Sequence, residues 1–271
     1  MGVRSPSYQA GFYAPERGGR PAYPQAWRGC VGAWNPGLGP SGLVLRDWGG
    51  RKNHGTLTNG PVWSTSTGRQ ALSLDGVNDF VGGTAPQIIG ISQSTMAFWL
   101  RIVNLSTGDV NQTPVRFGPV NANGARRVDI QQNGAINSDY YLEGTLSSAA
   151  GEVVAGTWYH IATTQTATTQ AIYKNGKLLA STARTPSVIA SGLYQIGRRT
   201  PSVGYTYPVN GQMDDVRVYN RALPADEVNL LAQRPGIAYE LAPRRFISLP
   251  SPSFSAAWAL RQSIIIGGGL Q

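Results

Sequence analysis

Cysteine, lysine and long apolar runs are scarce in this 271-residue chain, and each scarcity excludes a class of protein. Cys30 is the only cysteine, so no internal disulfide can form and the fold needs an apolar core. Cys30 precedes a strand-like segment, and we expect it to be a small buried apolar residue and not a nucleophile. No apolar run reaches the roughly 20 residues of a membrane-spanning helix. The sequence therefore predicts a protein that folds around its own core and has no membrane partner.

Glutamates and histidines are also few, which argues against catalysis. No two of the five glutamates are spaced to share one face of a strand, and Glu143 and Glu152 bound a segment that reads as a polar loop. His160 lies in a strand-like segment and is expected to be a buried sheet residue, whereas His54 lies in a loop. Nucleophile elbows, phosphate loops and Cys/His metal clusters are absent from the sequence. We expect a protein that is not an enzyme.

The net charge of +9 comes mostly from arginine, since only three of the 23 basic residues are lysines. A high isoelectric point is typical of nucleic-acid-binding proteins, but no basic cluster here exceeds two residues. Arginine suits partly buried interfaces because its planar guanidinium makes bidentate contacts. We interpret the charge as solubilising and interfacial, with no specific nucleic-acid partner.

Glycine (34) and proline (18) are abundant, and they separate short segments rich in β-branched and aromatic residues. Residues 95–102 and 157–164 are examples of such segments. Asn175-Gly176, between two apolar runs, predicts a hairpin with a type I′ turn, because both turn residues need a positive φ. Many short strands joined by turns favour an all-β sandwich or jelly roll.

One short helix is expected after the last strand. Pro224 suits a first helical turn, acidic residues follow it, and Leu223, Val228 and Leu231 can face inward at helical spacing. The composition divides the chain into an extended N-terminal arm (1–30), a strand-rich domain (31–233) and an extended C-terminal arm (234–271). The helix would cap the domain.

Four segments occur in a fixed order: "LRDWGGRKNHGTLTNGPVW", "GRQALSLDGVNDFV", "GTWYHIATT…AIYKNGKLLAS" and "NGQMDDVRVYNRALPADEVNLL". They resemble the laminin-G-like, concanavalin A-like jelly-roll family, with Gly49 and Leu74 where the family has Ser and Phe. The resemblance implies an all-β concanavalin A-like jelly-roll β-sandwich over residues 31–233. It does not imply one function, because the fold serves lectins, glycosidases, adhesins and structural modules. The Glu-x-Asp-x-(x)-Glu strand of the glycosidases is absent.

The same resemblance implies one candidate metal site. Relatives often bind calcium between the opening loop, which Asp47 and Asn53 match, and the last strand, which Asp214 matches. Alternation places Asp214 on the face of Val216 and Val218, where a carboxylate needs a partner. That partner is either one structural calcium or a hydrogen bond from backbone or arginine.

The two arms resemble extensions of jelly-roll domains in tailed-phage virion proteins. We expect them to order on a partner, inserting aromatic and aliphatic side chains into its grooves and pairing arginines with its acidic surface. The alternative is that both arms fold back on their own domain. The candidate partner-binding residues are Tyr8, Phe12, Tyr13, Tyr23, Trp27, Arg244, Arg245, Phe254, Trp258, Arg261, Ile264, Ile265 and Ile266.

Two functions follow from these expectations. The first is a virion structural protein, a capsid decoration or cement protein that is located in the virion and forms a homo-oligomer. Its partner would be the major capsid protein or another virion protein. The second is a carbohydrate-binding, lectin-like module for host surface glycans, in which Trp48, Tyr205 and Tyr207 could stack on sugars.

Overall fold

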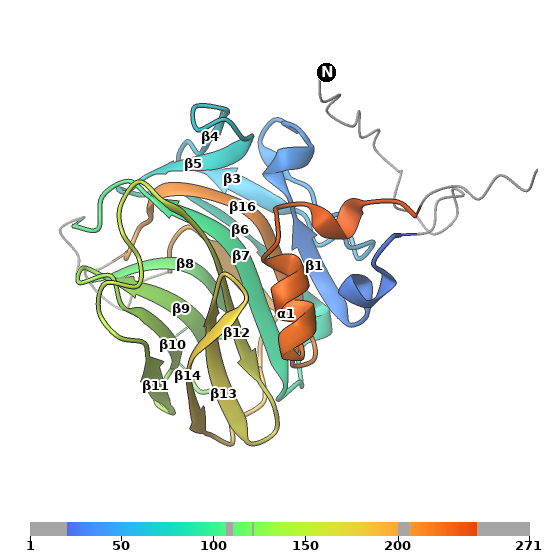
Figure 1. Ribbon diagram of the computed structural model, residues 1–271, viewed down its shortest axis with the longest axis vertical. Coiled ribbons are helices and arrows are strands. Elements are labelled where there is room, and N and C mark those ends of the chain that lie inside the picture. The colour runs from blue at the N-terminus through green and yellow to red at the C-terminus, as the bar shows by residue number, and fades with distance from the viewer. Residues whose placement is uncertain (1–20, 107–110, 121, 200–205, 243–271) are drawn as a thin grey trace, which may run out of the picture.

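The computed structural model describes residues 21–106, 111–120, 122–199 and 206–242. These residues form a sandwich of two antiparallel sheets, each of eight strands, with an α-helix outside it (Figure 1). The predicted all-β concanavalin A-like jelly roll is confirmed. Among the described residues, no helix is long and apolar enough to cross a membrane.

The first sheet has the order β14-β13-β12-β7-β16-β5-β4, and β1 also pairs with β16. Its strands are β1 (Cys30–Trp34), β4 (Val62–Ser64), β5 (Ala71–Asp75), β7 (Ser94–Ile102), β12 (Trp158–Gln165), β13 (Thr169–Lys174), β14 (Lys177–Ala183) and β16 (Asn210–Tyr219).

The second sheet has the order β11-β10-β9-β8-β15-β6-β3-β2. Its strands are β2 (Val44–Leu45), β3 (Gly55–Thr58), β6 (Phe80–Thr84), β8 (Asn111–Phe117), β9 (Arg126–Gln131), β10 (Ile136–Tyr140), β11 (Gly144–Ser147) and β15 (Leu193–Ile196).

The predicted hairpin joins β13 to β14. Asn175 and Gly176 have φ values of 48° and 80°, as a type I′ turn requires. The turn therefore matches the right-handed twist of the two strands that it connects.

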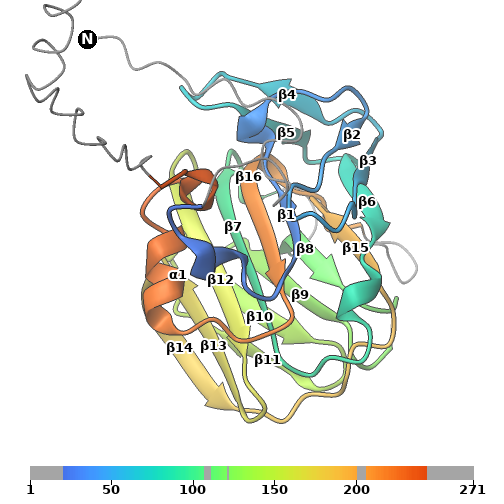
Figure 2. The same cartoon turned by 90° about the vertical axis from the view of Figure 1, so that its right-hand side faces the viewer.

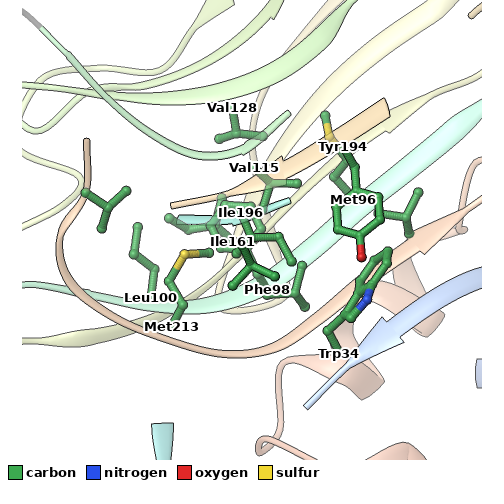
Figure 3. Packing of buried hydrophobic residues seen from close by; sticks show 14 of the residues in the cluster. Trp34, Met96, Phe98, Leu100, Val115, Val128, Ile161, Tyr194, Ile196 and Met213 are labelled. Carbon is green, nitrogen blue, oxygen red and sulfur yellow. The ribbon is translucent and has the colours of Figure 1, made fainter. Parts of the chain in front are cut away.

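The main core lies between the two sheets (Figure 3). Trp34 is fully buried, and its ring lies 4.5 Å from that of Tyr194, centre to centre. The Trp34 indole N–H and the Tyr194 hydroxyl both donate to the carbonyl of Asn53, at 2.8 and 2.9 Å. Two aromatic side chains thus enter the core with their polar atoms satisfied.

The predicted capping helix is α1 (Ala225–Leu231), and Pro224 precedes it as an extended N-cap residue. Leu223, Val228 and Leu231 are buried as expected. They belong to a second apolar cluster, outside the first sheet, that α1 covers (Figure 2). The 3-10 helices of the structure are η1 (Pro24–Trp27), η2 (Pro36–Leu38), η3 (Pro86–Ile88) and η4 (Ile237–Tyr239).

The folded unit extends beyond the expected boundaries at residues 31 and 233. Pro21 forms an isolated antiparallel bridge with Leu241, and the Ala22 N–H donates to the Glu240 carbonyl at 2.7 Å. The described ends of both arms therefore lie side by side and pack on the sandwich. For these ends, the fold-back alternative describes the structure.

Candidate functional site

A row of polar side chains crosses the outer face of the second sheet, over β8, β9 and β10. Val128 and Ile130 of β9 point into the core, so the residues between and beside them point outward. The strand register places Arg127 between Arg116 on β8 and Asp139 on β10, and it places Asp129 opposite Asn137. We call this set the polar face: Arg116, Arg127, Asp129, Asn137 and Asp139.

One guanidinium holds both carboxylates of the polar face. Arg127 Nε lies 2.9 Å from Asp129, and its Nη2 pairs with Asp139. The Thr113 hydroxyl also donates to Asp129 at 2.6 Å, and the Thr145 hydroxyl donates to Asp139. The carboxylates are therefore neutralised and fixed in position.

Amide side chains extend the polar face at one end. Asn137 is only 6% exposed, and its Oδ1 is buried without a hydrogen-bond partner. Asn111 pairs with Gln131 across β8 and β9, and the Asn111 Oδ1 is likewise buried and unpartnered. The latter pair borders a pocket of about 330 Å³, which is lined by Asn111, Gln131, Gln132 and Asn133. Unsatisfied buried amide oxygens are costly, which marks this end as a place for an external donor.

An aromatic ring lies beside the same face. The Arg199 guanidinium sits 3.4 Å from the ring centre of Tyr207 and 3.8 Å from the Asp129 carboxylate. The Tyr207 carbonyl accepts the N–H of Thr113 on β8 at 3.0 Å, which ties this segment to the sheet. Tyr207, one of the predicted sugar-stacking residues, is therefore next to the polar face.

The other aromatic candidates are placed differently. Trp48 is half-buried and packs against the second apolar cluster, whereas Tyr205 lies outside the described residues. Tyr23 and Trp27 pack against the same cluster. The Trp27 indole N–H donates to the Ala238 carbonyl at 2.9 Å, so this part of the N-terminal arm lies on its own domain. The remaining arm candidates lie outside the described residues: Tyr8, Phe12, Tyr13, Arg244, Arg245, Phe254, Trp258, Arg261, Ile264, Ile265 and Ile266.

The predicted orientation of Asp214 is wrong. A β-bulge between Asp214 and Arg217 inserts one residue, Asp215, whose φ is 43°. The insertion shifts the alternation, so Val216 and Val218 face the main core while Asp214 faces the opposite side. Regular alternation could not reveal this, because the bulge changes the phase in the middle of the strand.

Asp214 lines a pocket of about 430 Å³ between η2, β16 and the segment that carries η4. Burial, and then the charge of Asp215, raise its pKa to about 7. Its Oδ1 accepts the N–H of Gly37 at 3.2 Å, and the nearby Asn35 Oδ1 is buried without a partner. A Cβ at Gly37 would lie 2.8 Å from the Asn35 Oδ1 and 3.4 Å from the Asp214 Oδ1, so glycine leaves room for these oxygens.

Asp47 and Asn53 come together in the opening loop, but with hydrogen bonds of their own. The Asp47 carboxylate accepts the N–H groups of Ala33, Gly49 and Asn53, at 2.9, 2.7 and 2.9 Å. Across the described parts of the chain, no group of three or more His, Cys, Asp or Glu side chains is placed to hold a metal. These backbone N–H groups compensate the burial of the Asp47 carboxylate.

Histidine and cysteine are placed as the sequence indicated. His160 is buried in β12, where desolvation, and then the Arg217 charge, lower its pKa to about 3, so it stays neutral. Cys30 is buried at the start of β1, and desolvation raises the pKa of its thiol to about 12. Neither side chain is presented as a base or a nucleophile at neutral pH.

The two glutamates considered for catalysis have structural partners. The Glu143 carboxylate accepts the N–H groups of Gly124 and Ser187, both at 3.0 Å, and Glu152 pairs with Lys174. Glutamate spacing carries no information about the aspartates of the polar face, which strand pairing brings together. Asn133-Gly134 signals a turn, but a two-residue loop there would set Asp129 opposite Ser138. The structure instead has a three-residue loop at 132–134, and this loop sets Asp129 opposite Asn137.

A family model described as "Concanavalin A-like lectin/glucanases superfamily" matches residues 75–229, which is more than half of the chain. No curated protein matches the chain. Solved structures share the fold at low sequence identity, and the chain spans between a third and about half of their length.

Three solved structures illustrate this similarity. A Trypanosoma rangeli sialidase in complex with sialic acid has a TM-score of 0.60 and 17% identity, over 76% of this chain and 33% of the sialidase. The binding domain of Paraclostridial Mosquitocidal Protein 1 has a TM-score of 0.60 and 15% identity, over 77% and 52%. The botulinum neurotoxin serotype C1 binding domain has a TM-score of 0.59 and 13% identity, over 77% and 52%.

Proposed function

Because the chain belongs to the concanavalin A-like lectin/glucanases superfamily, we propose that it is a carbohydrate-binding module whose binding site is the polar face. The observation that carries this proposal is the buried, unpartnered Oδ1 of Asn137, which lies opposite Asp129, two residues along β9 from the Gln131 of the amide-lined pocket. A buried acceptor without a partner is expensive, and a hydroxyl donor from a ligand would satisfy it.

The side chains at this site suit sugars. Asparagine, aspartate and arginine present paired acceptors or donors in a plane, which match two adjacent sugar hydroxyls. Tyr207 adds an aromatic ring, and the apolar face of a pyranose can stack on such a ring. Arg127 and its two carboxylates hold the polar groups in place before a ligand arrives, which lowers the entropic cost of binding.

Binding to a glycan array, followed by calorimetry on the glycans retained, tests the proposal. Asn137→Ala should weaken binding by about tenfold, since one good hydrogen bond is worth about 1.4 kcal/mol in binding. Asn229→Ala is the matched control, because Asn229 is an exposed asparagine of α1, outside the opposite sheet. No binding by the wild-type protein, or equal binding by both variants, would remove this site from consideration.

We also propose that the module does not hydrolyse its ligand. Hydrolysis of a glycosidic bond usually needs two carboxyl groups that are free to act as acid and as base or nucleophile. Here Arg127 holds both Asp129 and Asp139. Reducing-sugar release from the bound glycans should stay at the level of buffer, and turnover abolished by Asp129→Asn or Asp139→Asn would contradict this expectation.

The virion structural role is a second proposal, supported by the sequence resemblance of the arms. The family and the polar face support glycan binding more directly than capsid decoration. A glycan-binding module that is anchored in a virion would satisfy both proposals. Co-sedimentation of the full chain, and of a chain ending at Ala242, with particles that lack the protein tests the anchor; equal sedimentation would show that residues 243–271 are not needed.

A structural calcium ion is a separate proposal, with a revised donor set. Asn35 and Asp214 line the pocket beside Gly37. Backbone N–H groups bind only the Oδ1 of Asp214, whereas they bind both carboxylate oxygens of Asp47. Oxygen ligands of this kind are those that calcium prefers. Calcium should raise the melting temperature of the wild-type protein but not of Asp214→Asn, and equal melting curves with calcium and with chelator would exclude the site.

A further inference from the structure

Arg116 is a buried arginine without an acidic partner among the described residues. It lies in the middle of the polar face and is only 5% exposed. Its Nη2 donates to the backbone carbonyls of Gly118 and Pro119, and no carboxylate of the described part of the chain contacts it. Most buried arginines pair with a carboxylate, because an uncompensated charge in a desolvated site is costly.

The neighbours of Arg116 increase this imbalance. Arg127 and Arg199 lie close enough that their charges, together with the larger effect of burial, lower the pKa of Arg116 to about 10. Within the described ranges, Asp129 and Asp139 are the carboxylates that oppose these three guanidiniums, and both already pair with Arg127. The polar face together with Arg199 therefore carries one positive charge in excess.

We infer that the polar face selects glycans that carry an anionic group, a carboxylate or a sulfate, which supplies the charge that Arg116 lacks. This inference rests on the proposed glycan-binding function and names the class of ligand. Arg127 and Arg199 reach solvent, with side chains 20% and 16% exposed, so these two guanidiniums contact the anion. Arg116 lies beneath the surface and strengthens the attraction through its charge.

The same charge balance argues against a polyanion such as a nucleic acid. The excess is one charge, and the two aspartates repel further anions along the face. The amide-lined pocket next to Asn111 and Gln131 offers uncharged donors and acceptors instead. A ligand with one anionic group among neutral hydroxyls matches this arrangement.

The test uses immobilised oligosaccharides in matched sets with the same backbone: neutral, carboxylated and sulfated. The full-length protein should bind the acidic members at least tenfold more tightly than the neutral ones, and this preference should shrink as salt rises. Carboxylated and sulfated members distinguish the two sources of negative charge. Preference for either one supports the inference.

Arginine variants test which side chains cause the preference for acidic oligosaccharides. Arg116→Gln and Arg199→Gln should each reduce the ratio of acidic to neutral binding several-fold. Arg28→Gln removes the same charge from a side chain that is 75% exposed at the end of η1, and it should leave the preference unchanged. If Arg116→Gln does not fold, as judged by circular dichroism, Arg199→Gln alone decides.

The outcomes separate this inference from the proposed function. Equal binding to neutral and acidic members of one set would overturn the inference and leave glycan binding intact. Binding to no member of any set would contradict the proposed function itself. A preference for acidic members that persists in both Arg116→Gln and Arg199→Gln would also overturn the inference, because the selectivity would then arise elsewhere.

Discussion

The two sheets of the sandwich have outer faces of opposite character. On the first sheet, α1, η1 and η4 cover an apolar layer (Figure 2), and its one buried ion pair joins Arg217 to Asp215 at 2.9 Å. The rings of Trp27 and Tyr239 enclose the Arg217 guanidinium, at 4.8 and 4.6 Å from their centres. The charge is thus buried completely, inside a layer built from both ends of the chain.

On the second sheet, charged side chains lie on the outer face, and those of Arg127 and Arg199 keep contact with solvent. Arg127 forms ion pairs with two carboxylates, as Arg217 does with Asp215. The side chain of Arg127, however, remains 20% exposed. Similar pairs of charged residues therefore stabilise the fold on one face and remain available to a ligand on the other. The role of a charged pair, in stability or in ligand binding, therefore depends on whether the terminal segments of the chain pack over the outer face that carries it.

The largest effect should come from removing the cover of the first sheet. A chain that ends at Gln233 loses the buried side chains of Ile237 and Tyr239, which are each worth roughly 2–5 kcal/mol of unfolding free energy. Thermal denaturation should show a large loss of stability relative to a chain that ends at Ala242. Equal melting temperatures would mean that η4 does not contribute to the core.

Removing one arginine from each face should give unequal losses. Arg217→Met leaves Asp215 buried beside apolar rings, so the unfolding free energy should fall by about 3–5 kcal/mol. Arg127→Met should cost less than about 2 kcal/mol, because Asp129 keeps its bonds to Thr113 and Arg199. Urea denaturation of both variants measures the difference, and equal losses would contradict the contrast between the faces.

The buried His160 on the covered face should make stability depend on pH. Its pKa is about 3 in the folded protein and 6.5 in the unfolded chain, so between these values the unfolded chain binds more protons. The contribution to stability is present above pH 6.5 and is lost as the pH falls, by about 1.4 kcal/mol per pH unit. The difference between the wild-type and His160→Gln stability curves should have this slope, and parallel curves would refute it.

The smallest effect on stability is expected on the polar face. Asn137→Ala removes an amide whose Oδ1 has no partner, so the unfolding free energy should change by less than about 1 kcal/mol. Its melting temperature should therefore stay close to that of the wild-type protein while glycan binding falls. A large loss of stability would show that Asn137 has a structural role instead.

Much of the fold could be predicted because it depends on local signals. The Asn175-Gly176 turn needs positive φ at both residues, and Leu223, Val228 and Leu231 recur at helical spacing, so each element is encoded within a few residues. The burial of Cys30 and His160 could be predicted for the same reason, because their neighbours along the chain form strands. By contrast, alternation gave the wrong face for Asp214, since one inserted residue reverses the pattern without a clear local signal.

By itself, the sequence determined which segments become strands, turns and helix, because these choices depend on neighbouring residues and on the period of the apolar pattern. The tertiary structure alone decided which outer face is covered. Residues 21–28 and 234–242 are far apart along the chain, and the cover forms only where both segments pack on the same sheet. It also decided that Arg116 has no carboxylate while Arg127 has two. Strand register sets those distances, and the charge left over on the polar face is a property of the whole sheet.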